Sequence, residues 1–422
     1  MTLEPVHIKA ISNFAKRIDL CRDDEDTKTA SDLFEMLREL RYGGQVVLRS
    51  IGDLKRSKVN IDRMALSRNP FEITYSCDSG STNPLSFDNG LLVDFCHCAL
   101  ASTPTDLDLH RKRTIVSATY SPSSKVTIKT TDEWEMFDES EVRCKIVRIQ
   151  PGLLNKRIKR MVHNIAIYLS ESEHILWIMG ELDKDGFFIM DGPIYPKQLM
   201  YWMVVESDDI QIRYDSHAKK ILQNYIDIMD HHIENRIPIV GFVKNPEDMQ
   251  IMDTIKKQGG RVDIPWVLDA QFFKNTLSLD GNGGGKNSGN NRCITYTNWF
   301  MQPNQFYEKM LNSTSPLVAG SVDHKFDKED YSLTFFMVYV PMTGVVFKVE
   351  SPYGITKNEE MRNTITRKIL YDLCVSGFPT TLSKADSVAK IRLSERQQII
   401  KQFDGLKIDT MYNDIRWGEM DD

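Results

Sequence analysis

Two short phrases decide how this chain folds: Tyr75-Ser-Cys-Asp-Ser-Gly-Ser-Thr82 and Phe187-Phe-Ile-Met-Asp-Gly-Pro-Ile-Tyr-Pro196. In each, an apolar, strand-like run leads to an aspartate, and a nearby glycine lets the backbone turn tightly. Carboxylates at the ends of buried strands can aim oxygen ligands at a metal ion from a rigid platform. One such aspartate would mean little, because Asp-Gly is also ordinary turn chemistry. Two of them, Asp78 and Asp191, joined by a helix rich in acid, predict a three-carboxylate metal site that cuts phosphodiesters.

The segments around these phrases alternate between strand-like and helical patterns. Residues 71–119 predict a meander of short antiparallel strands, with the first core strand ending at Asp78. The period becomes helical from Gly152, and strands are predicted at 187–190 and 238–244. Further elements are expected as helices over 195–204 and 216–235, a hairpin over 331–350, and a helix over 358–376. We therefore expect an α/β fold, a mixed sheet flanked by helices, with a C-terminal helical extension.

The N-terminal segment has a different pattern. Residues 4–41 contain two amphipathic helical stripes separated by a polar stretch. We expect residues 1–60 to form an N-terminal helical region and residues 61–422 to form one larger domain. The Gly- and Asn-rich run at about 280–291 is expected to be a flexible insertion in that domain.

Composition indicates a soluble globular protein: 422 residues, 41% hydrophobic and 27% charged. No stretch approaches the roughly 20 apolar residues of a membrane span, and the N-terminus lacks a signal-peptide pattern. We therefore expect a cytoplasmic protein without membrane contact. Seven cysteines, an odd and sparse number, indicate free thiols rather than disulfides.

The net charge of -6, from 53 basic and 59 acidic residues, does not indicate a nucleic-acid binder. Phosphate binding usually leaves a basic footprint. A local cluster exists in Asn155-Lys-Arg-Ile-Lys-Arg160, which is either a phosphate-binding segment or the solvated start of a helix. Both interpretations stay open at this point.

The predicted metal ligands are Asp78, Glu173 and Asp191. Glu173 lies beside the apolar stripe of its helix, and Glu171 is the alternative if the helical phase is wrong by half a turn. Hard oxygen ligands select Mg²⁺ or Mn²⁺, and two such ions roughly 4 Å apart suit phosphodiester cleavage. Lys244, at the end of its strand, either steadies a phosphate or faces solvent. The alternative is a purely structural role, in which these acids cap helices or form turns.

Two other groups of ligand-type residues are less convincing. In Cys96-His97-Cys98, strand alternation places the cysteines on one face and the histidine on the other, so a core strand is the better interpretation. The pair His231-His232 lies on a predicted helix without partner motifs, and we expect it at the surface.

Taken as an ordered set, several phrases resemble the NurA nuclease family of archaeal DNA end processing, particularly its haloarchaeal-type members. These phrases are residues 78–82, 89–94 (Asn-Gly-Leu-Leu-Val-Asp), 168–174 (Tyr-Leu-Ser-Glu-Ser-Glu-His), 191–196, 241–246 (Gly-Phe-Val-Lys-Asn-Pro), 296–300, 349–353 and 377–386. The resemblance implies an RNase H-like core and a manganese-dependent 5′ to 3′ exonuclease on single- and double-stranded DNA, with endonuclease activity on single strands. It also implies a homodimer that works with the hexameric ATPase HerA in end resection for recombinational repair.

By motif position, Asp78 and Asp191 resemble the family's metal-binding aspartates, and its helix glutamate falls on Glu173 or Glu171. The late phrase departs from many relatives, which carry a tyrosine and a histidine where this chain has Phe378 and Asp386. A phenyl ring cannot replace the tyrosine's hydrogen bond, whereas Asp386 can still bind a metal ion through oxygen. The departure keeps two alternatives open: a non-catalytic adaptor that binds DNA or the ATPase, and an RNA-cleaving enzyme on the same fold.

Overall fold

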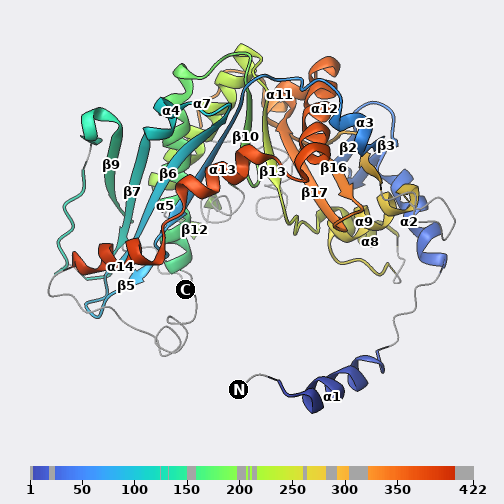
Figure 1. Ribbon diagram of the computed structural model, residues 1–422, viewed down its shortest axis with the longest axis horizontal. Coiled ribbons are helices and arrows are strands. Elements are labelled where there is room, and N and C mark those ends of the chain that lie inside the picture. Colours follow the sequence, from blue (N-terminus) through green and yellow to red (C-terminus); the bar gives the residue numbers. More distant parts are fainter. Residues whose placement is uncertain are drawn as a thin grey trace.

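A computed structural model describes residues 3–18, 24–123, 125–131, 133–149, 158–196, 206–207, 210–211, 216–259, 264–281, 292–303 and 322–403. Within these ranges, fifteen strands join one large mixed sheet, and helices cover both of its faces (Figure 1). This confirms the expected α/β class, the N-terminal helices and the C-terminal helical extension. The RNase H-like arrangement implied by the resemblance stays a prediction.

The first half of the chain supplies strands to both ends of the sheet. Its elements are α1 (Pro5–Ala15), α2 (Asp24–Met36), β1 (Glu39–Tyr42), β2 (Gln45–Ser50), β3 (Arg56–Asn60), α3 (Ile61–Ala65), β4 (Thr74–Ser81), β5 (Leu85–Ser86), β6 (Leu92–Thr103), α4 (Leu107–Arg111), β7 (Arg113–Tyr120), β8 (Glu135–Phe137), β9 (Val142–Arg148), α5 (Ile158–Ile178) and β10 (Phe187–Asp191). The 3-10 turns η1 (Asp138–Ser140) and η2 (Met179–Glu181) connect some of them.

The second half completes the sheet and adds the C-terminal helices. Its elements are β11 (Glu206–Ser207), β12 (Ile210–Gln211), α7 (Ser216–Asn235), β13 (Ile239–Val243), α8 (Gln250–Gly259), α9 (Asp269–Gly281), β14 (Cys293–Thr297), β15 (Phe300–Gln302), η4 (Lys328–Tyr331), β16 (Leu333–Val340), β17 (Val345–Pro352), α11 (Tyr353–Thr356), α12 (Glu359–Ser376), α13 (Thr380–Ala389) and α14 (Leu393–Lys401). β11 and β12 form a separate small ribbon.

The order of the main sheet is β1-β2-β15-β16-β17-β13-β10-β4-β6-β7-β9-β8, with β14 pairing β16 and β3, and β5 pairing β6. The centre is parallel, because β10 runs parallel to both β4 and β13. The predicted meander of β4, β6 and β7 is confirmed as antiparallel, and so is the β16–β17 hairpin. The predicted helices over 216–235 and 358–376 correspond to α7 and α12; the expected helix over 195–204 lies almost wholly outside the described residues.

The N-terminal region differs from the expectation of a purely helical segment. Residues 39–60 form β1, β2 and β3, which pair with one another or with strands near residue 300. The sequence does not predict these strands, because β2 and β3 pair with strands that follow much later in the sequence. The expected flexible insertion at 280–291 lies almost entirely outside the described residues, as does the first half (155–157) of the basic cluster at 155–160.

Different helices pack on the two faces of the central sheet. Helix α5 packs on β4, β6 and β7 and also contacts α7, whereas α13 crosses β4, β6 and β10 (Figure 1). Strand alternation separates the two: Cys96 contacts Ser170 of α5, and its neighbour His97 contacts Ala389 of α13. A second apolar cluster, which includes Phe34, Phe273 and Phe335, lies at the other end of the sheet under α2, α8 and α9.

Candidate active site

Parallel pairing of β4 and β10 brings the two predicted aspartates together. Met190 lies opposite Cys77, so the next residues, Asp191 and Asp78, are neighbours on adjacent strands. Adjacent strands are about 4.8 Å apart, and residues in register point to the same face. Strand β4 continues to Ser81, so Asp78 lies inside its strand and not at the end, which corrects the sequence expectation. Strand β10 ends at Asp191, whereas β4 continues beyond Asp78. The last residues of β4, Ser79 to Ser81, therefore pair with β6 on one side only.

Of the two candidate glutamates on α5, Glu171 is the one within electrostatic range of both aspartates. The Ser79 hydroxyl, next to Asp78 in β4, donates a hydrogen bond to the Glu171 carboxylate. Glu173 lies elsewhere: its Oε1 accepts a 3.0 Å hydrogen bond from Asn224 of α7, and its Oε2 is 3.7 Å from Arg143 of β9. The alternative assignment, Glu171, is therefore the one that the geometry favours.

Burial and mutual repulsion raise the pKa values of two of these acids. The pKa of Asp78 is raised to about 7, first by burial and then by the carboxylates of Asp191 and Asp386, against the Ser79 N–H and Lys244. The pKa of Glu171 is raised to about 8, again first by burial, with Asp78 and Asp191 adding repulsion against the Ser79 hydroxyl bond. Closely spaced carboxylates that resist ionisation are the electrostatic pattern that a divalent cation relieves.

Lys244 follows β13 directly and joins the cluster as its cation. Its Nζ lies 2.6 Å from Asp191 Oδ2 and 5.3 Å from the centre of the Phe378 ring. Phe378 itself packs edge-on against Phe242 of β13. The two ring contacts indicate a positioning role for Phe378, in which it borders Lys244 without offering a hydroxyl group.

Two glycines allow the backbone to approach closely at this site. A Cβ on Gly241 would lie 2.5 Å from the Ile194 nitrogen and 2.7 Å from the Gly192 oxygen, so the segment after Asp191 can pass over β13 only because Gly241 has no side chain. A Cβ on Gly80 would lie 2.0 Å from the Ala389 oxygen at the end of α13. This approach brings α13, and with it the exposed Asp386, within the electrostatic range of Asp78.

A buried carboxylate holds the segment that follows Asp191. Glu350 of β17 is fully buried, and its Oε2 accepts a 3.1 Å hydrogen bond from the Ile194 N–H. Its Oε1 lies 2.8 Å from Lys348, which also pairs with Asp248 at 2.6 Å. This network ties the loop after Asp191 to the centre of the sheet.

Comparison with known proteins places the chain in a family. The family model of the NurA domain matches residues 73–391, which is most of the sequence and includes every residue of the acid cluster. The chain belongs to the NurA domain family. No curated protein matches it significantly.

Solved structures of NurA proteins resemble the chain over nearly their whole length. The NurA nuclease from Sulfolobus solfataricus is 10% identical, with 95% of this chain and 96% of that chain covered and a TM-score of 0.46. A NurA crystallised with manganese is 10% identical, with 90% and 96% covered and a TM-score of 0.40. At these values the superpositions carry no argument about individual residues, so family membership rests on the sequence match.

The acid cluster of this NurA domain fits a hard divalent cation in its chemistry. Asp78, Glu171 and Asp191 offer only oxygen ligands, and burial, followed by carboxylate repulsion, raises the pKa of Asp78 and of Glu171. Within the described ranges, no group of three or more His, Cys, Asp and Glu side chains is already arranged to hold a metal ion. The donor set is therefore present, while its side chains are not oriented as a finished coordination shell.

The other ligand-type residues of the NurA domain have structural roles. Cys96 and Cys98 are completely buried on the α5 face and His97 faces α13, as strand alternation predicted. His232 contradicts the expectation of a surface pair, because it is buried and its Nδ1 donates to the Ile237 oxygen. Burial lowers the pKa of His232 to about 3, so it is a neutral core residue. The surface prediction was wrong because α7 packs against the sheet at this position.

Sequence reasoning missed two features of the site. Ser79 was quoted but given no role, although its position between Asp78 and Gly80 was the available signal. Asp94 was quoted only as the end of a phrase; it is a completely buried carboxylate surrounded by polar side chains. The described cysteines are all free, as predicted. Among the described helices, none combines the length and apolar character needed to cross a bilayer.

Proposed function

We propose that this protein is a metal-dependent deoxyribonuclease that hydrolyses phosphodiester bonds. Membership of the NurA domain family supports the proposal, because a solved relative is named a nuclease. The observation that carries it is the acid cluster: Asp78 and Asp191 on adjacent parallel strands, with Glu171 linked to the same strand through Ser79. Carboxylates of this kind, buried and mutually repelling, are suited to binding divalent ions.

In the proposed mechanism, Asp78, Glu171 and Asp191 hold Mn²⁺ or Mg²⁺, with two ions expected and Asp386 as a further candidate ligand. The bound ions supply neutralisation of phosphate charge and activation of the attacking water. Lys244 steadies a phosphate near Asp191 as a point charge, and the Phe378 ring keeps its ammonium group in place. Glu350 positions the segment after Asp191 through the Ile194 N–H. A solved relative that contains manganese supports the choice of metal.

The finer parts of the proposal follow the family resemblance. We propose a 5′ to 3′ exonuclease on single- and double-stranded DNA with endonuclease activity on single strands. It acts in the cytoplasm as a homodimer, with a HerA-type hexameric ATPase, in end resection for recombinational repair. End-labelled substrates give the polarity, light scattering gives the oligomeric state, and mixing with the ATPase tests the partnership.

The two glutamates of α5 provide a matched pair of variants. Glu171→Gln and Glu173→Gln are the same chemical change two positions apart on one helix. End-labelled DNA is incubated with Mn²⁺, and a chelator serves as the metal control. E171Q should reduce cleavage at least a hundredfold, whereas E173Q should stay within a fewfold of the parent, because Glu173 binds Asn224 and Arg143.

The outcomes separate the remaining alternatives. If E173Q loses activity and E171Q keeps it, the assignment of the helix ligand is reversed. If the parent protein binds DNA but never cleaves it with Mn²⁺ or Mg²⁺, the protein is the non-catalytic adaptor instead. If the protein cleaves RNA in preference to DNA in side-by-side assays, its substrate is RNA and the proposed deoxyribonuclease activity is wrong.

A further inference from the structure

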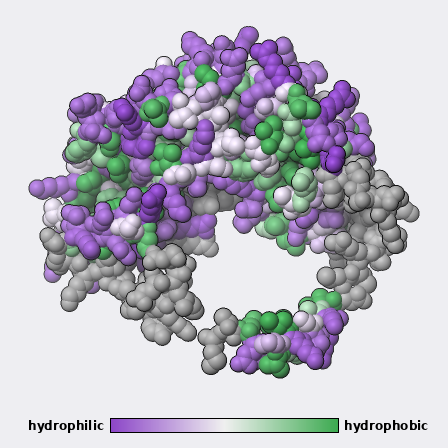
Figure 2. Space-filling view, viewed as in Figure 1, coloured by the Kyte–Doolittle hydropathy of each residue, from purple (hydrophilic) through white to green (hydrophobic). Residues whose placement is uncertain are grey.

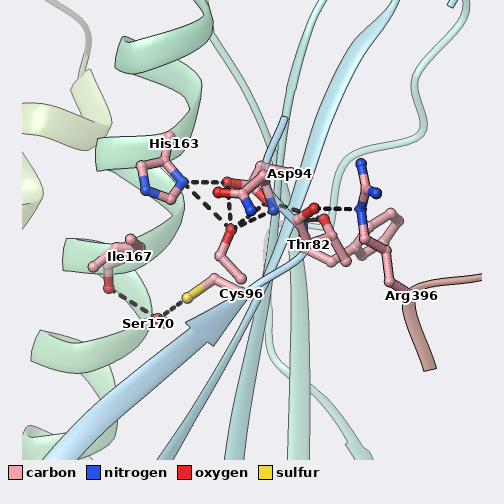
Figure 3. Close-up of polar contacts among 10 residues, drawn as sticks. Thr82, Asp94, Cys96, His163, Ile167, Ser170 and Arg396 are labelled. Carbon is pink, nitrogen blue, oxygen red and sulfur yellow. Dashed lines mark hydrogen bonds and ion pairs between the residues drawn. The ribbon is translucent and has the colours of Figure 1, made fainter. Parts of the chain in front are cut away.

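A second group of polar side chains lies between β6 and α5 (Figure 3). Asp94 of β6 is its centre. The Ser81 hydroxyl donates to both Asp94 oxygens at 2.7 and 2.8 Å, and the Thr82 hydroxyl donates to Oδ1 at 3.0 Å. His163 of α5 approaches from the other side, with its Nδ1 2.8 Å from Asp94 Oδ2.

The geometry of this group fixes the tautomer of the histidine. A carboxylate offers only acceptors, so the His163 Nδ1 must donate its proton to Asp94. The carboxylate is completely buried, whereas the His163 side chain is 30% exposed. No hydrogen bond from the Nε2 of His163 to any of the described residues is present. The ring is therefore held at Nδ1, and within the described part of the chain its Nε2 is not engaged.

The polar group around Asp94 shares two elements with the acid cluster, although Asp94 itself belongs to β6 and Asp191 to β10. Ser81 and Asp78 belong to β4, and His163 and Glu171 belong to α5. Eight residues of helix separate His163 from Glu171, which is about two turns or 12 Å. That length corresponds to a few nucleotides of a DNA strand. Arg160, exposed and one turn before His163, adds positive charge at the same end of the helix.

We propose that His163, oriented by Asp94, is a binding residue that donates from Nε2 to a backbone phosphate of the DNA strand, a few nucleotides from the scissile bond. The proposal rests on the proposed deoxyribonuclease function. In the complex the ring lies between two hydrogen-bond acceptors, the Asp94 carboxylate at Nδ1 and the phosphate at Nε2. His163 binds and aligns the DNA strand and takes no part in the chemical step, since it is too far along α5 to touch the reacting atoms.

The test measures binding separately from cleavage. His163→Gln is made in an Asp78→Asn background, and a fluorescent single-stranded oligonucleotide is titrated by anisotropy at several salt concentrations. The dissociation constant should rise about three- to fivefold, the range of one solvent-accessible ion pair. The slope of log K against log salt should fall by about one, as for loss of one phosphate contact. His231→Gln, half-buried on α7, is the matched control and should change neither value.

Two further variants exclude a merely structural role. Asp94→Asn keeps the shape of the side chain but removes its charge; it should weaken binding as H163Q does, and the double variant should add little. Ser81→Ala removes a hydrogen bond from Asp94 and keeps the imidazole, so it should lower stability but leave the salt slope unchanged. If H163Q does not fold, the dissociation constant and the salt slope of D94N test the proposal instead.

The same variants are also made in the protein that retains Asp78, and their cleavage rates give an independent result. H163Q should raise KM and leave kcat within twofold. Unchanged binding and an unchanged salt slope in H163Q overturn the proposal, and so does a fall in kcat at constant KM. Because binding is measured in the D78N background, a failure of the nuclease proposal and a failure of the His163 proposal are distinguished.

Discussion

Replacing Asp78 with asparagine should stabilise the metal-free protein at high pH while it abolishes cleavage. Burial and neighbouring carboxylates raise the pKa of Asp78 from its ordinary value of 3.8 to about 7 in the folded protein. The folded state therefore holds this proton more tightly than the unfolded chain does. Stability is lost as the pH rises from about 4 to about 7, because in this window the native state binds more protons than the unfolded state.

The magnitude follows from the size of the shift. About three pKa units correspond to about 4 kcal/mol at most. Asp78 is only half-buried and its ionisation is coupled to that of Glu171, so we reduce this figure to about 2 kcal/mol. Asparagine keeps an oxygen that can accept the Ser79 N–H bond and never ionises. D78N should thus equal the parent protein near pH 4 and exceed its stability by about 2 kcal/mol at pH 8.

Urea unfolding followed by tryptophan fluorescence, in EDTA at both pH values, measures this difference. Asp88→Asn, at an exposed turn position, is the control, and its stability should stay close to that of the parent. Adding Mn²⁺ should then stabilise the parent more than D78N, because the ion binds only the native acid cluster. The reasoning is refuted if D78N is no more stable than the parent at pH 8, or if it is destabilised equally at both pH values.

Three further substitutions follow from the packing of the site. Gly80→Ala places a Cβ 2.0 Å from the Ala389 oxygen, so it should cost about 1–3 kcal/mol in urea unfolding and reduce cleavage; Gly180→Ala, with open space around it, should do neither. Lys348→Met leaves Glu350 buried without its cation, which should cost about 3–5 kcal/mol and also lower kcat; unchanged stability would contradict the ion-pair argument. Phe378→Leu removes the ring beside Lys244 and should raise KM a fewfold, whereas Phe378→Tyr should keep the parent KM; equal effects would exclude a role for the ring.

Local sequence pattern predicted the parts of the site that depend on strand ends. Asp191 and Lys244 each follow an apolar run with a glycine close by, and both runs are strands of the parallel centre. The phase of α5 could not be read in the same way. Helix α5 is covered by the sheet on one side and by α7 on another, so its buried positions surround most of the helix and the apolar stripe does not define a single face. Only the contacts of Glu171 with Ser79 and of Glu173 with Asn224 separate the two glutamates.

Long-range pairing explains the other differences. The strands of residues 39–60 have few apolar residues, and their identity depends on partners far along the chain, such as β14 opposite β3. The buried state of His232 depends on its contact with Phe188 of β10, a strand that comes well before α7 in the sequence. Information of this kind is not present in a window of neighbouring residues.

The interleaved strand order also constrains how the molecule is made. β4, which carries Asp78, emerges early in synthesis, yet its parallel neighbour β10 and then β13, β17 and β16 follow over more than 250 residues. β2 and β3 likewise form long before their partners β15 and β14 are made. A nascent chain must keep these edges unpaired on the ribosome until the last strands appear, which favours slow folding and chaperone engagement. Truncation before residue 352 would leave the central strands with an open edge, and such fragments should aggregate when expressed.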